Sequence, residues 1–469
     1  MAATHSVVLT SICAYLLLLL GIGIWVSRRN QSSSDFFLGD RRLGPWVTGI
    51  SYSASASSAW TLLGVSGAAF SLGPAVIWVA LGSFSGMIVA WRWVSRPLLD
   101  ASHRHQLVTF SDYLTHGIPD RDRRQLTRSI GAIILIAFVF YIAAQFQGAG
   151  LAFSNTFALD SQWAIVAGAV IILVYTWLGG YWAVSLTDAI QGLVMGAAAL
   201  ALPVATWLEF GSDPALRAQL VPSISGITQT LGEGFTLAGL GFALGSLGIS
   251  LGTFGQPHLI VRFMSLRDNE ARRRAGMITV IWYLIVFSGM VFSGLAARAL
   301  VIEADNPEHI FFALSETVLS PLAAGLLVAA VLSAIMSTAD SQLLVCASTL
   351  SHDLSTSASQ RPQPAALRNG RLAVMAVVVL ALLVALFLPA PIFSRVLFAW
   401  SALGAALGPI LFSRLLHWRI TPSQHGWGVW LGFLLTVCLS LLPNSPGDIA
   451  ERLLPFAVHL LFLAHVRRR

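Results

Sequence analysis

The sequence predicts an all-α integral membrane protein with about 13 transmembrane helices in one domain covering residues 1–469. Hydrophobic residues make up 56% of the chain and charged residues only 10%, whereas a soluble globular chain carries about 25% charged residues. Apolar runs long enough to cross a bilayer follow one another along the sequence and are separated by short polar segments. Composition and spacing together indicate no separate soluble domain.

The predicted spans each approach the roughly 20 residues that a helix needs to cross the hydrocarbon core. No basic segment precedes the first span, so we interpret it as a retained helix and not as a cleaved signal peptide. Between spans, 103–128 and 209–232 are polar enough for local structure, with room for a short helix in the second, and 355–366 has the composition of a flexible linker. The spans lie at about 6–27, 46–72, 75–97, 129–154, 162–184, 187–208, 232–260, 276–301, 320–350, 371–390, 392–415, 425–443 and 452–466.

The arginines predict the orientation of the chain. Lysine is absent, and 24 of the 28 arginines fall in or beside the loops that follow the odd-numbered spans and in the C-terminal tail. Loops rich in positive charge remain on the cytoplasmic side. The N-terminus is therefore expected outside and the C-terminus inside. The net charge of +7 follows from this topology, and nucleic acid is not expected as a partner.

Several classes of chemistry lack their motifs here. Cys13, Cys346 and Cys438 all lie in apolar segments without metal-ligand spacing, so neither a disulfide framework nor a zinc site is expected. There is no Walker A sequence and no metalloprotease His-Glu-x-x-His signature. We therefore expect no enzyme activity, and no ATP-driven pump.

The stretch from Gly49 to Trp60 is crowded with hydroxyls and small side chains although it lies inside a predicted span. An unsatisfied polar group in hydrocarbon costs several kcal/mol, so this run must face protein, water or an ion. One interpretation is a helix–helix packing face made of small residues. The other is a broken helix whose hydroxyls and freed carbonyls form a neutral cage for a cation.

A second interruption is predicted in the seventh span, where glycines recur from Gly239 to Gly255 and Pro257 follows. Glycine is unfavourable inside a helix, and proline removes a backbone donor. Interrupted helices at matching positions of two halves point to a transporter built from inverted repeats. The repeats would be two blocks of five helices, at about 46–208 and 232–415, with peripheral helices at 6–27, 425–443 and 452–466.

Polar residues also cluster in the ninth span. Ala334, Ser337, Thr338 and Ser341 share one helical face by their spacing, and their oxygens suit a hard cation. The alternative is that these hydroxyls bond to the preceding turn. Only Asp188 and Asp340 are carboxylates at plausible membrane depth. Asp188 could balance a cation or gate the inner exit, or it could merely cap its helix at the interface.

The chain resembles the sodium/solute symporter family, most closely its bacterial sodium/proline members, in four ordered motifs. These are 37–45 (FLGDRRLGP), 183–191 (AVSLTDAIQ), 255–264 (GQPHLIVRFM) and 336–346 (MSTADSQLLVC). The resemblance implies a LeuT-like fold with a core of two inverted five-helix repeats, in the inner bacterial membrane. It also implies import of a small organic solute driven by Na⁺.

The resemblance also implies site residues. The sodium site of the family matches Ala54, Ser57, Ala334, Ser337 and Thr338, and a second cation or coupling site matches Asp188, Asp340 and Ser341. The substrate region matches Ser55, Ser58, Trp60, Tyr141, Ile249, Thr253, Gln256 and Pro257. Three positions depart from the proline carriers: Ala56 replaces an aspartate, and Ile249 and Thr253 of the substrate region replace two aromatics.

We therefore expect a Na⁺-coupled symporter that imports proline or a similar amino acid or carboxylate by alternating access. Its partners would be the solute, the sodium ion and membrane lipid. The missing carboxylate at Ala56 keeps a proton-coupled carrier or a passive facilitator as the alternative. A transporter-like solute sensor is the rival from another class. The sequence leaves the solute, the stoichiometry and the oligomeric state open.

Overall fold

The structure is a computed structural model that describes residues 2–27, 38, 41–157, 159–178, 181–212, 214, 237–354, 363–443 and 445–467. Within these residues the chain is helical, and its one β-bridge is an isolated pair between Leu43 and Leu266. The α-helices are α1 (Ala2–Ser27), α3 (Pro45–Ala59), α4 (Ser66–Leu72), α5 (Ile77–Val89), α6 (Ser95–His105), α7 (Phe110–Thr115), α8 (Asp120–Phe157), α9 (Ser161–Leu178), α10 (Tyr181–Phe210), α12 (Leu237–Gly252), α13 (Pro257–Ser265), α14 (Asn269–Ala299), α15 (Ile310–Val318), α16 (Pro321–Ser348), α17 (Gln363–Phe387), α18 (Ile392–Leu415), α19 (Pro422–Ser440) and α20 (Ile449–Val466).

The all-α membrane architecture predicted from the sequence is confirmed. Seven helical segments among the described residues are long and apolar enough to cross a bilayer, and the first of them, Pro45–His105, is a continuous run of 61 residues. Four shorter apolar helices accompany them, at Leu9–Ile22, Ser161–Val174, Gly239–Gly255 and Val374–Phe387. The exact number of 13 spans therefore stays a prediction. Most of 209–232 and of the proposed linker 355–366 lies outside the described residues.

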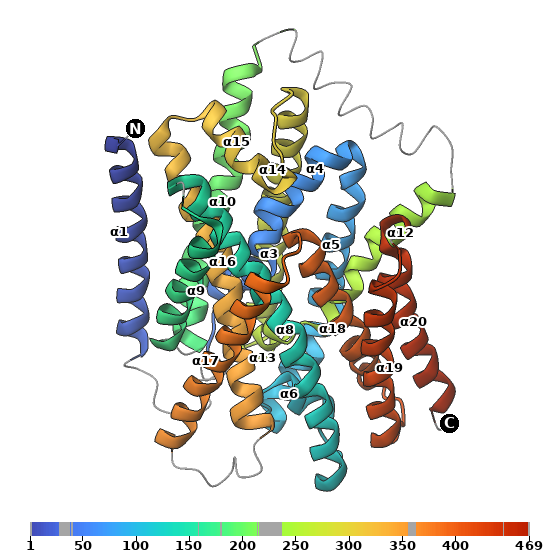
Figure 1. The fold of residues 1–469 in the computed structure, drawn as a ribbon. Helices are drawn as coiled ribbons and strands as arrows, with labels where there is room; N and C mark the ends of the chain where they lie inside the picture. Colours follow the sequence, from blue (N-terminus) through green and yellow to red (C-terminus); the bar gives the residue numbers. More distant parts are fainter. Residues whose placement is uncertain are drawn as a thin grey trace.

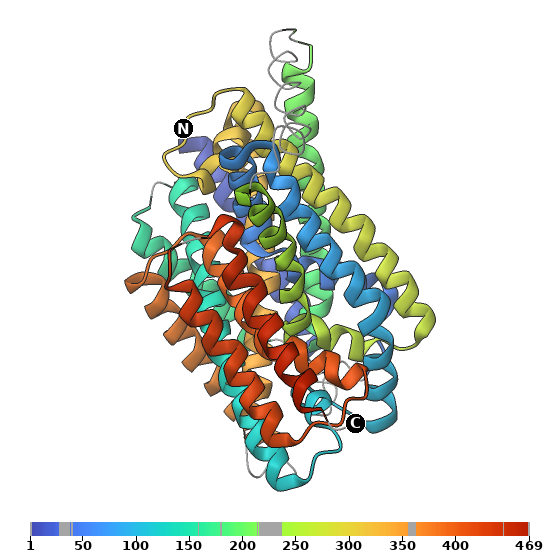
Figure 2. The same ribbon diagram turned by 90° about the vertical axis from the view of Figure 1, so that its right-hand side faces the viewer.

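Helix α3 lies at the centre of the bundle (Figure 1) and packs against α10, α14 and α16. Helix α1 stands at one edge of the molecule, where it contacts α9, α10 and α16. The opposite edge is formed by α12, α19 and α20, which face the viewer in Figure 2. Helix α1 begins near one end of the bundle and α20 finishes toward the other (Figure 1).

Two helices at the centre are interrupted. In α3 the backbone leaves helical geometry at Ser58, where φ is 23° and ψ is −175°. The donors freed by this break are satisfied, because the N–H of Ala59 donates to Gln145 Oε1 at 3.1 Å and that of Trp60 to Ser58 Oγ at 3.1 Å. The second break separates α12 from α13 at Gln256, which is extended, and Pro257 then begins α13. Proline suits this position because the first helical residue needs no N–H partner.

The segment between α6 and α8 is ordered by a capping box at the start of α7. Thr109 and Asp112 cap each other, and Asp112 also pairs with Arg123 at 2.9 Å and with His352 at 3.2 Å. Burial disfavours the Asp112 carboxylate, but the hydrogen bond and charge of His352 and two backbone N–H groups outweigh burial and lower its pKa to about 2. This network ties the end of the α16 helix to α7 and α8.

Close backbone approaches at glycine hold the second broken helix in place. A Cβ atom built on Gly82 of α5 would lie 2.1 Å from the carbonyl oxygen of Ser246 on α12, and one on Gly255 would lie 2.1 Å from that of Leu403 on α18. Any side chain at these positions would force the helices apart. The glycines of the seventh span are therefore packing sites as well as helix breakers.

We expect Gly82→Ala to destabilise the folded protein by about 1 to 3 kcal/mol, the usual range for overpacking a tight contact. The measurement is the thermal unfolding of the detergent-solubilised protein, followed by fluorescence. Gly426→Ala is the matched control, because a Cβ atom there meets nothing within 4 Å. Equal unfolding temperatures for the two variants would contradict the close approach of α5 and α12.

Candidate functional site

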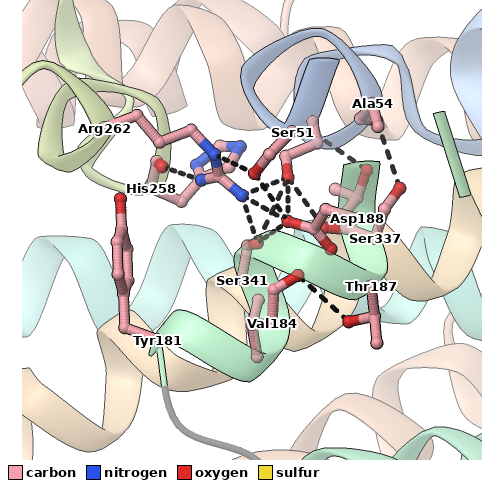
Figure 3. A network of polar contacts seen from close by, with 12 residues as sticks. Ser51, Ala54, Tyr181, Val184, Thr187, Asp188, His258, Arg262, Ser337 and Ser341 are labelled. Carbon is pink, nitrogen blue, oxygen red and sulfur yellow. Dashed lines mark hydrogen bonds and ion pairs between the residues drawn. The ribbon is translucent and has the colours of Figure 1, made fainter. Parts of the chain in front are cut away.

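A buried ion pair lies where α3, α10, α13 and α16 meet (Figure 3). Arg262 Nη2 lies 2.5 Å from Asp188 Oδ2, and the two side chains are 1% and 0% exposed. The carboxylate oxygen also accepts hydrogen bonds from Ser51 at 3.2 Å, Ser55 at 3.0 Å and Ser341 at 3.1 Å. A charge pair out of water is tolerated only with this density of additional hydrogen bonds.

Arg262 contacts nearly the same oxygens from its own side. Its Nε donates to Ser51 Oγ at 2.9 Å, and its Nη2 donates to Ser55 Oγ at 2.6 Å and to Ser341 Oγ at 2.8 Å. The remaining nitrogen, Nη1, donates to the carbonyl of His258 one turn earlier in α13. The guanidinium thus joins three other helices around one carboxylate.

This geometry decides between the two interpretations of Asp188. Helix α10 begins at Tyr181, so Asp188 lies about two turns inside the helix and does not cap it. The span boundary expected near residue 187 is therefore wrong, since the helix starts six residues earlier. Likewise the seventh span does not end near residue 260: α13 continues to Ser265 and carries Arg262 into the buried region.

Four of the five residues predicted for the first sodium site meet where α3 crosses α16: Ala54, Ala334, Ser337 and Thr338. Ser337 Oγ donates to the carbonyl of Ala54 at 3.2 Å and Thr338 Oγ1 to the carbonyl of Ser55 at 2.9 Å. Ser337 also donates to the carbonyl of Ala334 at 3.2 Å. The hydroxyl of Ser57 is buried and lies near Tyr283 of α14, and among the described residues it makes no hydrogen bond to α16. These oxygens all face protein and none faces lipid.

The members of the predicted second cation site are only partly joined. Asp188 and Ser341 are hydrogen-bonded at 3.1 Å. Asp340 is fully buried on α16 and interacts with Asp188 and with the backbone of Ser341. Ser55, which the sequence placed with the substrate residues, also belongs to the ion-pair network through Asp188 and Arg262, and its hydroxyl lies 2.9 Å from the carbonyl oxygen of Ser337.

The other predicted substrate residues surround the two helix breaks. Tyr141 accepts a hydrogen bond from Trp400 Nε1 at 3.0 Å, and Trp60 stacks on Phe393 with ring centroids 5.8 Å apart. Ser58 accepts from the backbone of Trp60 at the first break, and Thr253, Gln256 and Pro257 form the second. Ile249 lies one turn before that break and is 3% exposed.

Sequence reasoning did not single out five residues that the structure places here: Ser51, Gln145, His258, Arg262 and Trp400. His258 is 1% exposed, faces Tyr141 edge-on at 6.2 Å and has no hydrogen-bond partner on either ring nitrogen among the described residues. The signal for Arg262 was present, because an ionisable residue inside a span indicates function. Arg262 was not singled out because the predicted seventh span ends at residue 260, two residues before it.

A cavity is lined by residues of both the ion-pair network and the segment around α7. They include Arg262, Ser341, Thr109, Asp353, Tyr181 and His258. Its free volume is about 20 Å³, roughly enough for one water molecule.

Two interrupted helices, buried oxygens at their breaks and a buried ion pair define the site of a secondary transporter. Solved structures show the same fold. A Na⁺-coupled sialic acid symporter in a substrate-bound outward-open state matches with a TM-score of 0.79 at 17% identity, covering 98% of this chain and 99% of that chain. Mhp1, a nucleobase-cation-symport-1 family transporter, matches with a TM-score of 0.60 at 16% identity, covering 93% and 96%. The fold is LeuT-like, as expected.

The chain belongs to the sodium:solute symporter family, whose sequence model matches residues 36–432. The high-affinity proline transporter PutP of Bacillus subtilis is 31% identical over 94% of this chain and 94% of its own length. The sodium/proline symporter of Escherichia coli is 31% identical over 95% of this chain and 91% of its own. The protein is thus a multi-pass inner-membrane symporter with sodium as the coupling ion, and not an enzyme.

Ser55→Ala should destabilise the protein by about 1 to 3 kcal/mol, because it leaves buried charged partners with one hydrogen bond fewer. Thermal unfolding of the purified variant measures this loss. Ser53→Ala is the control on the same helix, since the hydroxyl of Ser53 is equally buried but donates only to the carbonyl of Gly49 one turn back. If the two variants unfold at the same temperature, Ser55 does not stabilise the ion pair.

Proposed function

We propose that this symporter imports proline, or an amino acid or carboxylate of similar size, together with Na⁺ bound between α3 and α16. The single observation that supports the cation site most is the pairing of Ser337 and Thr338 with the backbone of Ala54 and Ser55 across two helices. Oxygens that already lie within 3.2 Å of one another need only small shifts to surround an ion of this size.

The proposed cage uses neutral oxygens only. Carbonyls of Ala54 and Ala334 and hydroxyls of Ser57, Ser337 and Thr338 can each turn a lone pair toward a cation. A hydroxyl that now donates to a carbonyl would reverse its role and become a ligand. Sodium would thereby hold the middle of α3 to α16, and an outward-open state that binds it better would gain population.

The substrate would bind between the two helix breaks. Polar atoms there are buried and lack partners among the described residues: Trp60 Nε1, Thr253 Oγ1, Gln256 Oε1 and both nitrogens of His258. Leaving such groups unpaired costs about 1 to 3 kcal/mol each, so a small solute with both donors and acceptors would be favoured there. A zwitterion has both. The relatives named as proline transporters favour proline among zwitterions, whereas Ile249 and Thr253 give this pocket fewer aromatic walls.

We further propose that the N-terminus faces the periplasm and the C-terminus the cytoplasm, as the arginine distribution predicts. Sodium would then enter down the membrane potential. At about −100 mV each inward charge contributes about 2.3 kcal/mol, which corresponds to roughly forty-fold accumulation of solute for each coupled ion.

Replacing both Ser337 and Thr338 by alanine should raise the sodium concentration for half-maximal uptake by more than about tenfold, since about 1.4 kcal/mol or more of binding is lost. Uptake into proteoliposomes at varied Na⁺ measures it. Ser333→Ala, one turn earlier on α16, serves as the control because its hydroxyl bonds to Tyr15 and to the Ala329 carbonyl and not to α3. An unchanged sodium dependence of uptake in the double variant would contradict the proposed sodium site between α3 and α16.

Radiolabelled proline, other amino acids and carboxylates, tested in proteoliposomes under imposed Na⁺ or H⁺ gradients, should show uptake that follows the Na⁺ gradient.

Combining Ala56→Asp with Ile249→Trp and Thr253→Tyr should increase proline uptake by rebuilding the carboxylate and aromatic walls of the proline carriers. No gain in a correctly folded triple variant would argue that these positions do not line the pocket. Uptake driven by H⁺ alone, or by neither ion, would instead indicate a proton-coupled carrier or a facilitator.

A further inference from the structure

The guanidinium of Arg262 takes up the oxygens that a second cation would need. Asp188 and Ser341 are two of the three residues predicted to hold such a cation, and both contact Arg262 Nη2, at 2.5 Å and 2.8 Å. Ser55, on the third side, lies 2.6 Å from the same nitrogen. At these distances an ion and the guanidinium cannot share the position.

Electrostatics also disfavours a sodium ion and the Arg262 guanidinium at Asp188 at the same time. A buried carboxylate is stabilised by one positive partner, and a second positive charge in the same dry region would be costly. Asp188 is fully buried and already has its partner. For a sodium ion to bind the carboxylate of Asp188, the guanidinium has to leave it.

Arg262 and the groups that hold it lie on different helices. It lies on α13, the nine-residue half-helix after the break at Gln256, and the extended residue separates the hydrogen bonds of α13 from those of α12. The side chains that hold the guanidinium, by contrast, lie on α3, α10 and α16. Movement of α13 alone would therefore withdraw the positive charge from Asp188.

We propose that Arg262 and a sodium ion are alternative partners of Asp188, so that Arg262 acts as a tethered cation that displaces the ion. This inference rests on the proposed Na⁺ symport and adds a competitor for the second ion. When α13 carries Arg262 into the site, Asp188 is neutralised without sodium and the ion is released. When α13 withdraws, sodium replaces the guanidinium. The position of one half-helix is thereby linked to occupancy by one ion.

Arg262→Gln tests the proposal because competition predicts tighter Na⁺ binding in the variant, which a purely structural role does not. The variant loses the competing charge, so Na⁺ should bind at least about tenfold more tightly, measured in the purified full chain without solute by Na⁺ titration of tryptophan fluorescence. Solute uptake should slow because release of the ion is no longer assisted. An arginine that merely supported the fold would give unchanged or weaker Na⁺ binding, and that result in the folded variant would overturn the proposal.

Three further variants complete the experiment. Adding Asp188→Asn to Arg262→Gln should abolish the tightening, because the ion then lacks its carboxylate. Arg395→Gln is the matched control, since Arg395 is also buried but bonds to Gln147 and to the carbonyl of Leu388; its Na⁺ affinity should not change. If Arg262→Gln does not fold, Arg262→Lys is used instead, because it keeps the charge but has fewer hydrogen-bond donors to hold it at Asp188. Na⁺ should then bind about two- to threefold more tightly. Unchanged or weaker Na⁺ binding would contradict the exchange of Arg262 for sodium. A wild-type protein that does not respond to Na⁺ would instead refute the proposed symport itself.

Discussion

The ion pair between Asp188 and Arg262 is the constraint on which the arrangement of the core depends. Its two charges are almost completely removed from water, and desolvation of that kind costs several kcal/mol per ion unless geometry and hydrogen bonds offset it. Serines from α3 and α16 supply the bonds, which fixes both helices at the level of Asp188. Sodium is proposed to bind where α3 crosses α16. This crossing lies next to the ion pair, because the hydroxyl of Ser55 contacts both Asp188 and the carbonyl of Ser337.

The dense hydroxyls of α3 do two things at once, so the packing and binding interpretations of this stretch are not exclusive. Ser53 bonds back to its own helix and leaves that face free for close packing. Ser51 and Ser55 instead reach the ion pair, and Ser57 is buried near Tyr283 of α14. The alternation arises because residues two apart on a helix point to different sides.

Features that depend on neighbouring residues in the sequence could be predicted, whereas contacts between distant segments could not. Spanning runs, the break at Pro257 and the polar face of α16 follow from hydropathy, proline chemistry and helical spacing, and each could be predicted. The ion pair could not, because Asp188 and Arg262 lie 74 residues apart and each was placed near a span boundary. Boundaries depend on tertiary packing, which lets α10 start earlier and α13 end later than hydropathy indicates. His258 was missed for another reason: one histidine in an apolar run carries no periodic signal.

The narrow cavity behind the ion pair also bears on how fast the protein can work. A passage with room for about one water molecule, bordered by Val261 and Leu344, cannot carry an ion with its hydration shell. Anything that leaves by this route must wait until the surrounding helices separate. Ion release by this route would then be limited by the frequency of helix movement and not by diffusion.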